Sequence, residues 1–396
     1  MPARLPRIRT DQRRARLAVR HHLAATAKAP STVVAAGDLV GFHATDPRSV
    51  YLEAWARVRD ATVESIQREL YEERSLLRML AMRRTLFVVP IELGGVMHAA
   101  CGLSVAASER RRLLRRLQSN GVTKHPERWL RDVEESTVRA LRRRGEATAA
   151  QLAEDEPRLR TKIVLAPGKR YEAAQSVSFW VLLVLAADGR IVRGRPRGSW
   201  ISRQYRWAPM EAWLQGGIPE WAIEDARAEL VRRWLASFGP GTFADLKWWS
   251  GLTAAQVHAA LAHVDTLEVV LDGGEAGLVL ADDLAPVATP QPSAALLPPL
   301  DSTVMGWTQR DWFLGEHRAA LFDRSGNAGP TLWWGGRIVG GWAQRADGEI
   351  AYRFLEDAGR DARDGAASEA ERLGVWLGRA KVLPAFRTPL EMELAG

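Results

Sequence analysis

The stretch that decides the fold and the site is LVGFHATDPRSVYLEAWARVR, residues 39–59. It places His43 and Thr45 two residues apart, so their side chains point to one side if this segment is extended. Asp46-Pro47 then predicts a helix start, because Asp accepts hydrogen bonds from free amides and Pro is tolerated at the first helical position. The stretch therefore predicts a small polar site beside a helix N-terminus, whose amides can also face a phosphate.

The composition narrows the class of protein. The 396 residues can bury a substantial core and predict more than one domain, and the net charge of +8 fits a polyanionic partner. One cysteine, Cys101, excludes an intrachain disulfide and a cysteine-rich zinc site, so we expect no metal and no cofactor. The sequence has neither an apolar run of about 18 residues nor an apolar signal core. We therefore expect a cytoplasmic, nucleoid-associated protein without a membrane span.

The expected elements repeat one plan three times. Each copy has helices followed by strands, which is the order of a winged helix-turn-helix. The motif TAAQ, a helix-capping box, occurs at 148–151 and again at 253–256, at equivalent places in the second and third copies. We therefore predict three tandem winged helix-turn-helix units, at residues 1–125, 126–213 and 214–285.

Local patterns place the elements of these units. In the first unit we expect helices at 11–27, 47–59 and 62–80 and a strand at 82–90. In the second unit we expect helices at 127–143 and about 173–187 before a hairpin. In the third unit we expect a helix at 219–238 and a hairpin around Asp272-Gly273-Gly274.

The pattern changes after the proline-rich segment 285–294. LLPPLD and AALFD resemble short strands, and Gly335-Gly336 and Asp347-Gly348 predict turns between further strands. A helix at 367–380 is expected to close the chain. Residues 286–396 therefore predict a small antiparallel β-barrel domain, and the whole chain an α+β fold.

Several segments also match a known family. They are RARLAVRHHL, LVGFHATDP, AWARV, MRRTLFVVP, LLPPLDSTVMGW, RDWFLG, FDRSGNAGPTLWWGGRIVGGWAQ and FRTPLE. The GNAGPT–GGW segment is the most specific of them. In these segments, over nearly its whole length, the chain resembles the winged-helix DNA-binding family that contains the azinomycin-resistance (AlkZ-like) DNA glycosylases.

The resemblance implies three winged helices and a β-barrel arranged as a C around duplex DNA. Family members cleave the N-glycosidic bond of bulky alkylated purines, often as self-resistance against a DNA-alkylating metabolite. Their active-site motif is glutamine–hydrophobic–glutamine, or glutamine–hydrophobic–aspartate in a relative subfamily. The matching positions here are His43-Ala44-Thr45, so both glutamines are replaced. The family strand MRGTLH also differs, and reads Met82-Arg-Arg-Thr-Leu-Phe87.

The substituted site remains chemically competent. An N7-alkylated purine is already cationic, so its enzyme must orient a water and stabilise positive charge on the sugar. A neutral His43 can orient that water and accept its proton, and the Thr45 hydroxyl can hold it. Because the closest upstream lysine is Lys28, a water nucleophile is favoured. The leading hypothesis is a monomeric, monofunctional glycosylase acting on double-stranded DNA that carries N7-alkylguanine adducts.

Each candidate residue also has a structural explanation. His43 can be a packed core histidine, and Thr45 can share the capping role of Asp46. The arginines expected to contact DNA can be solvated, and Trp334 can be core packing in the barrel. The candidate DNA contacts are Arg83, Arg84, Arg193, Arg195, Arg197, Trp334 and Arg337.

Two other functions stay open. Loss of both glutamines favours a non-catalytic DNA-binding protein, such as a regulator or lesion sensor, although no dimerisation helix is evident. The 16 tryptophans would also suit a protein that sequesters a polycyclic DNA-damaging metabolite by stacking.

Overall fold

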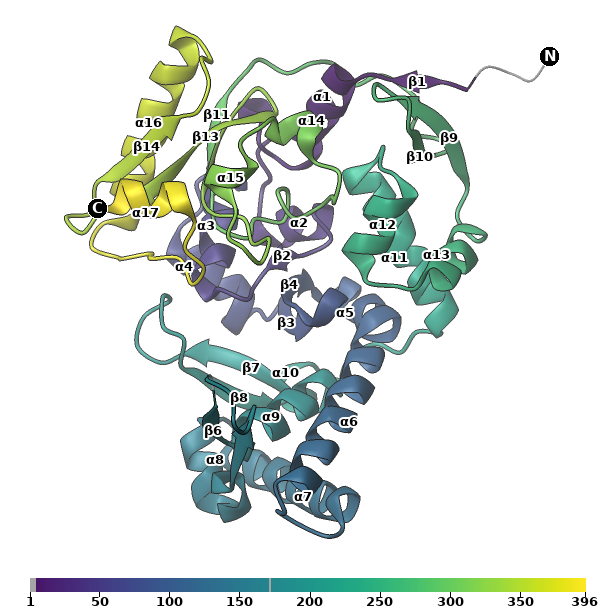
Figure 1. Ribbon diagram of the computed structural model, residues 1–396, viewed down its shortest axis with the longest axis vertical. Coiled ribbons are helices and arrows are strands. Elements are labelled where there is room, and N and C mark those ends of the chain that lie inside the picture. Colours follow the sequence, from purple (N-terminus) through teal and green to yellow (C-terminus); the bar gives the residue numbers. More distant parts are fainter. Residues whose placement is uncertain (1–4, 171) are drawn as a thin grey trace.

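The structure, a computed structural model, describes residues 5–170 and 172–396, so residues 1–4 of the first predicted unit lie outside it. Figure 1 shows an upper lobe built from the amino-terminal, third and carboxyl-terminal parts of the chain. The second part forms a lower lobe, and a long helical run connects the two. The fold is therefore mixed α and β, and segments distant in sequence lie side by side in the upper lobe.

The first part combines short helices with a three-stranded sheet of order β2-β4-β3, in which all pairs are antiparallel. His43 on β2 is paired with Phe87 on β4, which places it on an edge strand of this sheet. The elements are α1 (Thr10–Arg20), η1 (Ala25–Ala27), α2 (Thr32–Asp38), β2 (Phe42–His43), α3 (Pro47–Arg57), α4 (Val63–Gln67), η2 (Arg68–Glu72), β3 (Leu76–Leu80), η3 (Met82–Arg84) and β4 (Leu86–Pro90).

Two predictions for this part are wrong. The helix expected at 62–80 ends early, and Leu76–Leu80 is a strand, because every side chain of this segment is buried and its backbone pairs with β4. The strand expected at 82–90 begins only at Leu86, because Met82–Arg84 forms a single tight helical turn. Tertiary pairing thus overrides local propensity at both places.

One continuous helical run follows, made of α5 (Ile91–Met97), η4 (His98–Gly102) and α6 (Leu103–Ser119). It crosses from the upper to the lower lobe (Figure 1). The run of 29 residues is long and apolar enough to cross a membrane by length and composition, but 56% of its apolar window is buried inside the protein. Cys101 lies in it and is buried, as the sequence predicts.

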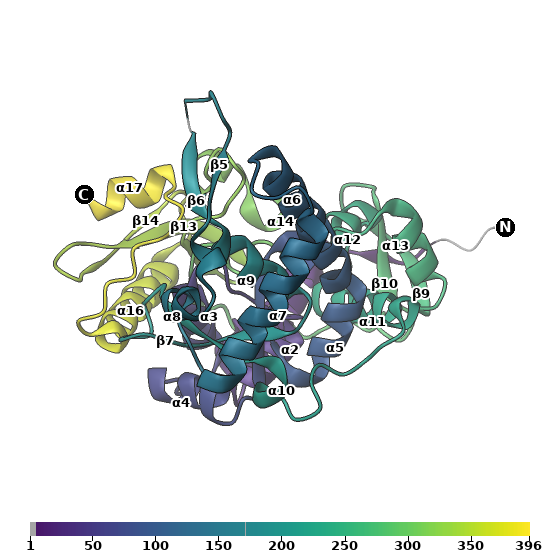
Figure 2. The ribbon, with the colours of Figure 1, turned by 90° about the horizontal axis from the view of Figure 1, so that it is seen from below.

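The second part follows its predicted order, with one addition. The Thr148–Gln151 capping box is confirmed, and the helix expected at 173–187 begins at Val177 because Ala173–Ser176 pairs with β5 instead. Figure 2 shows the resulting β5–β6 hairpin projecting from the lobe. The elements are α7 (Pro126–Arg144), α8 (Ala149–Asp155), η5 (Pro157–Arg160), β5 (Lys162–Leu165), β6 (Ala173–Ser176), α9 (Val177–Ala187), β7 (Ile191–Pro196), β8 (Tyr205–Pro209) and α10 (Met210–Trp213).

The third part has three helices and a hairpin, with the predicted cap at Thr253 confirmed. A short amino-terminal strand, β1 (Arg7–Ile8), pairs in parallel with its strand β9, so the start of the chain joins this distant part. The elements are α11 (Ile223–Phe238), α12 (Phe243–Ser250), α13 (Ala254–Leu261), β9 (Thr266–Leu271) and β10 (Ala276–Leu280).

The carboxyl-terminal part is an open sheet, so the predicted barrel is corrected. Its strands pair in the order β11-β12-β13-β14, and within the described residues β11 and β14 do not pair with each other. Helix α16 packs against both edge strands instead, and four strands are few for closure. AALFD is helical rather than a strand. The elements are β11 (Ala294–Leu297), α14 (Asp311–Leu314), α15 (Arg318–Leu321), β12 (Thr331–Trp334), β13 (Arg337–Gln344), β14 (Ile350–Phe354), α16 (Arg360–Leu377) and α17 (Pro389–Ala395).

An aromatic cluster joins the third and carboxyl-terminal parts. Phe238 of α11 lies edge-on to Trp307, with ring centres 5.1 Å apart, and Trp307 contacts Phe313 at 5.6 Å. The Trp307 indole also donates to the Phe238 carbonyl oxygen at 3.2 Å. These buried rings fix the segment after Asp301 against the rest of the upper lobe.

Asp245 of α12 provides a second link, and its truncation tests the connection. Its buried carboxylate accepts from the amides of Thr242, Thr308 and Gln309 at 2.8–3.1 Å. Asp245→Ala leaves these donors unpaired, so we expect a loss of about 3 kcal/mol in the free energy of unfolding. Thr253→Ala, which removes an exposed cap, should cost only about 1 kcal/mol. Urea denaturation measures both, and equal losses would contradict this role of Asp245.

Candidate active site

The helix that follows His43, α3, begins with the cap that the sequence predicts. The Asp46 carboxylate accepts from the Arg48 amide at 3.2 Å and from the Arg48 Nε at 2.8 Å. It also accepts from the Ala385 amide at 3.0 Å, so the carboxyl-terminal segment is tied to the same point. Asp46 therefore serves as the helix cap, and Thr45 beside it is exposed.

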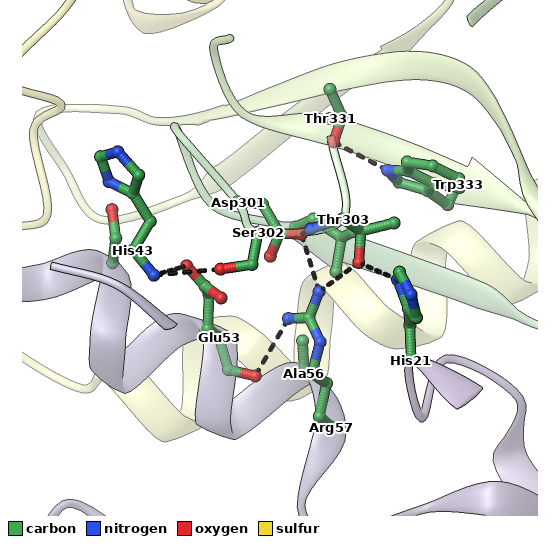
Figure 3. A network of polar contacts seen from close by, with 12 residues as sticks. His21, His43, Glu53, Ala56, Arg57, Asp301, Ser302, Thr303, Thr331 and Trp333 are labelled. Atoms are coloured by element: carbon green, nitrogen blue, oxygen red, sulfur yellow. Dashed lines mark hydrogen bonds and ion pairs between the residues drawn. The ribbon is translucent and has the colours of Figure 1, made fainter. Parts of the chain in front are cut away.

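The backbone of His43 is fixed by two side chains that the sequence did not single out. Its amide donates to the Ser302 Oγ at 3.0 Å and to the Glu53 Oε1 at 3.2 Å. Ser302 in turn donates to the Gly41 carbonyl oxygen at 3.0 Å. Figure 3 shows this network, with the His43 ring turned away from it. The imidazole is thus presented to a different environment from that of its backbone.

A buried ion pair supports this network. Arg57 of α3 donates to the Asp301 carboxylate at 2.7 Å and to the Thr303 Oγ1 at 2.9 Å, and both charged side chains are fully buried. His21 Nδ1 lies 2.9 Å from the same Thr303 hydroxyl (Figure 3). Because a lone buried charge is costly, Arg57 and Asp301 depend on each other. They lock α3 to the Asp301–Thr303 segment.

Glu53 lies within this network, where its ionised form is disfavoured. Burial, and then the nearby charge of Asp301, raise the pKa of Glu53 well above its ordinary value. Its Oε2 is buried and has no partner within the described chain. Glu53 can therefore hold the His43 amide without placing a negative charge beneath the site.

The His43 imidazole is neutral at physiological pH. Burial, and then the charge of Arg83, lower its pKa to about 3. The ring lies edge-on to Phe87 with centres 5.6 Å apart, and its Nδ1 is buried without a partner in the part of the chain that the structure describes. Such a ring is a good hydrogen-bond acceptor but a weak base. It is suited to orienting a water, and less to the proton acceptance also expected from the sequence.

Arg83 and Arg84 lie in a tight turn rather than on the predicted strand. Both have left-handed backbone conformations, with φ of 53° and 63°. Arg84 pairs with buried Glu109 at 2.7 Å, and Arg112 pairs with the same carboxylate. Arg83 instead lies over the ring of Trp248, with its guanidinium carbon 4.1 Å from the ring centre. Of the two, only Arg83 contributes to the lowered pKa of His43.

The predicted wing arginines lie on β7 and just beyond it in the lower lobe. Arg193 is largely buried over Tyr205 and Trp207, and burial lowers its pKa to about 10. Arg195 pairs with Glu72 of the first part at 2.9 Å. Arg197 is exposed. The loop end of this hairpin thus packs against the first part, where Trp200 also contacts Tyr51, and Arg197 is the most exposed of the three arginines.

Trp334 and Arg337 flank the Gly335-Gly336 turn. Trp334 is half-buried, and a Cβ on Gly365 of α16 would lie 3.0 Å from its ring. Arg337 forms an ion pair with Glu356. The turn itself lies against α1, since a Cβ on Gly336 would be 2.7 Å from the Arg14 carbonyl oxygen. Of the two hairpin turns predicted to reach DNA, the one at Asp347-Gly348 is the more exposed.

Sequence reasoning missed the residues beneath His43, although two signals could have found them. Glu53 and Arg57 are charged residues four apart on an otherwise apolar helix, which places them on one buried face. Asp301-Ser302-Thr303 is a polar run inside a buried apolar segment. No cluster of three or more metal-ligating side chains occurs among the residues that the structure describes.

Glu53→Gln tests the protonation state of this network. A raised carboxyl pKa means that stability falls as pH rises above the ordinary value toward the raised one, because the unfolded carboxyl ionises first. Gln keeps the acceptor for the His43 amide, so we expect Glu53→Gln to stabilise the protein at pH 8 by about 1–2 kcal/mol, with a smaller gain at pH 5.

Glu109→Gln provides the matched control. Glu109 is also buried but pairs with two arginines, so its amide variant should lose stability at pH 8. Urea denaturation at both pH values measures the two effects. A loss of stability in Glu53→Gln at pH 8 would show that Glu53 is ionised.

Comparisons with known proteins identify the family of the chain. A family model described as DNA glycosylase AlkZ-like matches residues 36–376, a range that contains His43, Glu53, Arg57 and the Asp301–Thr303 segment. Among solved structures, the chain is similar to the DNA glycosylase AlkZ of Streptomyces sahachiroi, with a TM-score of 0.72 and 22% sequence identity. That similarity covers 95% of this chain and 98% of the other. No curated protein sequence matches the chain.

Proposed function

Because the chain belongs to the AlkZ-like DNA glycosylase family, we propose that it hydrolyses the N-glycosidic bond of alkylated or bulky-adduct purines at a site centred on His43. The observation that carries this proposal is the buried, neutral imidazole of His43, whose backbone is fixed by Glu53 and Ser302. A neutral acceptor in a fixed position is what the glutamine amides of the family motif would also supply.

The chemistry needs no proton donor for the base. An N7-alkylated purine leaves as a neutral molecule, so the barrier lies in developing positive charge on the sugar and in placing the water. His43 accepts a hydrogen bond from that water and directs it at the sugar carbon. The exposed Thr45 hydroxyl, two residues along the chain, provides a second contact for the same water.

We further propose that three winged helix-turn-helix units bind the DNA. Residues 1–125, 126–213 and 214–285 each contain three or more helices with a strand pair after them, which supports this division. Arg197 and the Asp347-Gly348 turn would contact the backbone or a groove. The protein would act as a monomer in the cytoplasm on nucleoid DNA, in repair or self-resistance.

Substitution of His43 tests the mechanism. His43→Ala removes the acceptor, so we expect single-turnover excision of N7-methylguanine from duplex DNA to slow by about 10²–10³-fold. His43→Gln restores a neutral amide acceptor and should stay within about tenfold of the wild type. Base release, revealed by hot-alkali cleavage of the abasic product, measures both rates.

His258→Ala is the control, since His258 stacks on Phe243 in the third part. Excision that survives in His43→Ala would remove this mechanism. If the wild type excises neither N7-methylguanine nor a bulky adduct, yet binds duplex DNA tightly whether or not it is damaged, the non-catalytic DNA-binding function is favoured. Replacement of both family glutamines is the observation behind that alternative.

The pH dependence gives an independent test. With a pKa of about 3, His43 stays neutral down to strongly acidic pH, because protonation sets in only as pH approaches that value. We therefore expect a flat single-turnover rate between pH 5.5 and 8.5. If His43 had an ordinary pKa near 6.5, half of the molecules would be protonated at pH 6.5, and the rate there would fall to about half. An acidic limb near pH 6.5 that disappears in His43→Gln would contradict the buried, neutral state.

A further inference from the structure

Three arginines and two aromatic rings form a cluster beside His43. The guanidinium carbons of Arg83 and Arg310 lie over the ring of Trp248, at 4.1 and 5.1 Å from its centre. Those of Arg310 and Arg318 both lie 5.2 Å from the centre of the Phe322 ring. These five residues, here called the arginine–aromatic cluster, come from the first, third and carboxyl-terminal parts of the chain.

Among the described residues, the three arginines of this cluster form no close ion pair, although Asp245 and Asp311 attract Arg310 from a distance. Arg84 and Arg57, in contrast, each pair with a carboxylate. The Nε atoms of Arg83 and Arg310 are buried and have no partner there either. Asp245 attracts Arg310 from a distance, but its oxygens are already occupied by Thr242, Thr308 and Gln309.

The arginines are held in place despite their mutual repulsion. Burial lowers the pKa of Arg83 and of Arg310 to about 10, and for Arg310 the charges of Arg318 and Arg83 add to the effect. Both remain charged at pH 7. Arg310 is only 4% exposed, which fixes its guanidinium against Trp248 and Phe322. Arg310 is buried, Arg83 is half-buried and Arg318 is exposed, so an anion can reach the cluster from the Arg318 side. Like charges held together without a close counter-ion are unfavourable, and an anion from outside would stabilise them.

The backbone also fixes Arg83. Arg83 and Arg84 occupy the left-handed region that non-glycine residues rarely adopt, and such strain concentrates at functional sites. A Cβ on Gly251 would lie 3.1 Å from the Arg83 Cγ, so the third part closes tightly on this turn. Arg318 and Phe322 also line a surface hollow of about 840 Å³, so this end of the cluster is open to solvent.

We propose that Arg83, Arg310 and Arg318 clamp one backbone phosphate of the DNA strand next to the nucleotide at His43. This proposal rests on the proposed function for its DNA partner. The aromatic rings cover guanidinium faces, which leaves the planar N–H edges for an anion, and these edges match phosphate oxygens. The clamp joins three separate parts of the chain, so it forms only when the upper lobe is assembled.

A scan with neutral phosphate analogues tests the clamp without any need for excision. Duplexes carrying one tetrahydrofuran abasic analogue receive a single methylphosphonate at each flanking linkage in turn. Wild-type protein should lose about tenfold in affinity at one linkage. Arg318→Gln, an exposed position that the fold does not depend on, should weaken binding to unmodified DNA and show no further loss at that same linkage. Its salt dependence should also fall by about one ion.

Arg310→Gln should reproduce this pattern if its melting temperature shows that it folds. Arg360→Gln, at the exposed start of α16, is the matched control and should keep the wild-type scan. Additive losses at every linkage in Arg318→Gln, or a wild-type scan with no sensitive linkage, would overturn the clamp. These outcomes are separate from excision, because a glycosylase without the clamp would still pass the base-release test.

Discussion

The buried ion pair between Arg57 and Asp301 is the interaction on which the upper lobe depends. It joins a helix near the start of the chain to a segment 244 residues later, and Thr303 accepts a further hydrogen bond from Arg57 and contacts His21. Directly beside it, Ser302 holds the amide of His43. The position of the candidate catalytic ring is therefore set by contacts between distant parts of the chain, and it is lost if either charged partner is removed.

The candidate site combines two groups that favour their neutral forms, Glu53 and His43, with the positively charged arginine–aromatic cluster. Burial and the charge of Asp301 raise the pKa of Glu53 well above its ordinary value, and burial and the charge of Arg83 lower the pKa of His43 to about 3. Both shifts favour the neutral forms of the two groups. Among the residues that the structure describes, the positive charges at this site without an ion pair are those of the arginine–aromatic cluster, which we propose binds a phosphate. In this proposal, a phosphate of bound DNA supplies the negative charge that the cluster lacks. This arrangement suits a reaction in which positive charge must develop only on bound substrate.

Local chemistry explains which predictions succeeded. Asp46-Pro47, Thr148–Gln151 and Thr253–Gln256 start helices as predicted, because a cap is satisfied by residues within four positions of it. Leu76–Leu80 was predicted as helix and is a strand, because its pairing with β4 lies beyond any local window. The predicted barrel is an open sheet, since a helix covers the strands that closure would join.

The sequence by itself determined the family and the order of most helices and hairpins, and it singled out His43 as the candidate centre of the site, because these depend on motifs and short-range periodicity. Only the tertiary structure decided the protonation of His43 and Glu53 and the partners of each arginine. Arg83 and Arg84 are adjacent and identical in sequence, yet one meets Trp248 and the other Glu109. Their surroundings differ in burial and in the charges of residues distant in sequence, and neither property can be predicted from the neighbouring residues along the chain.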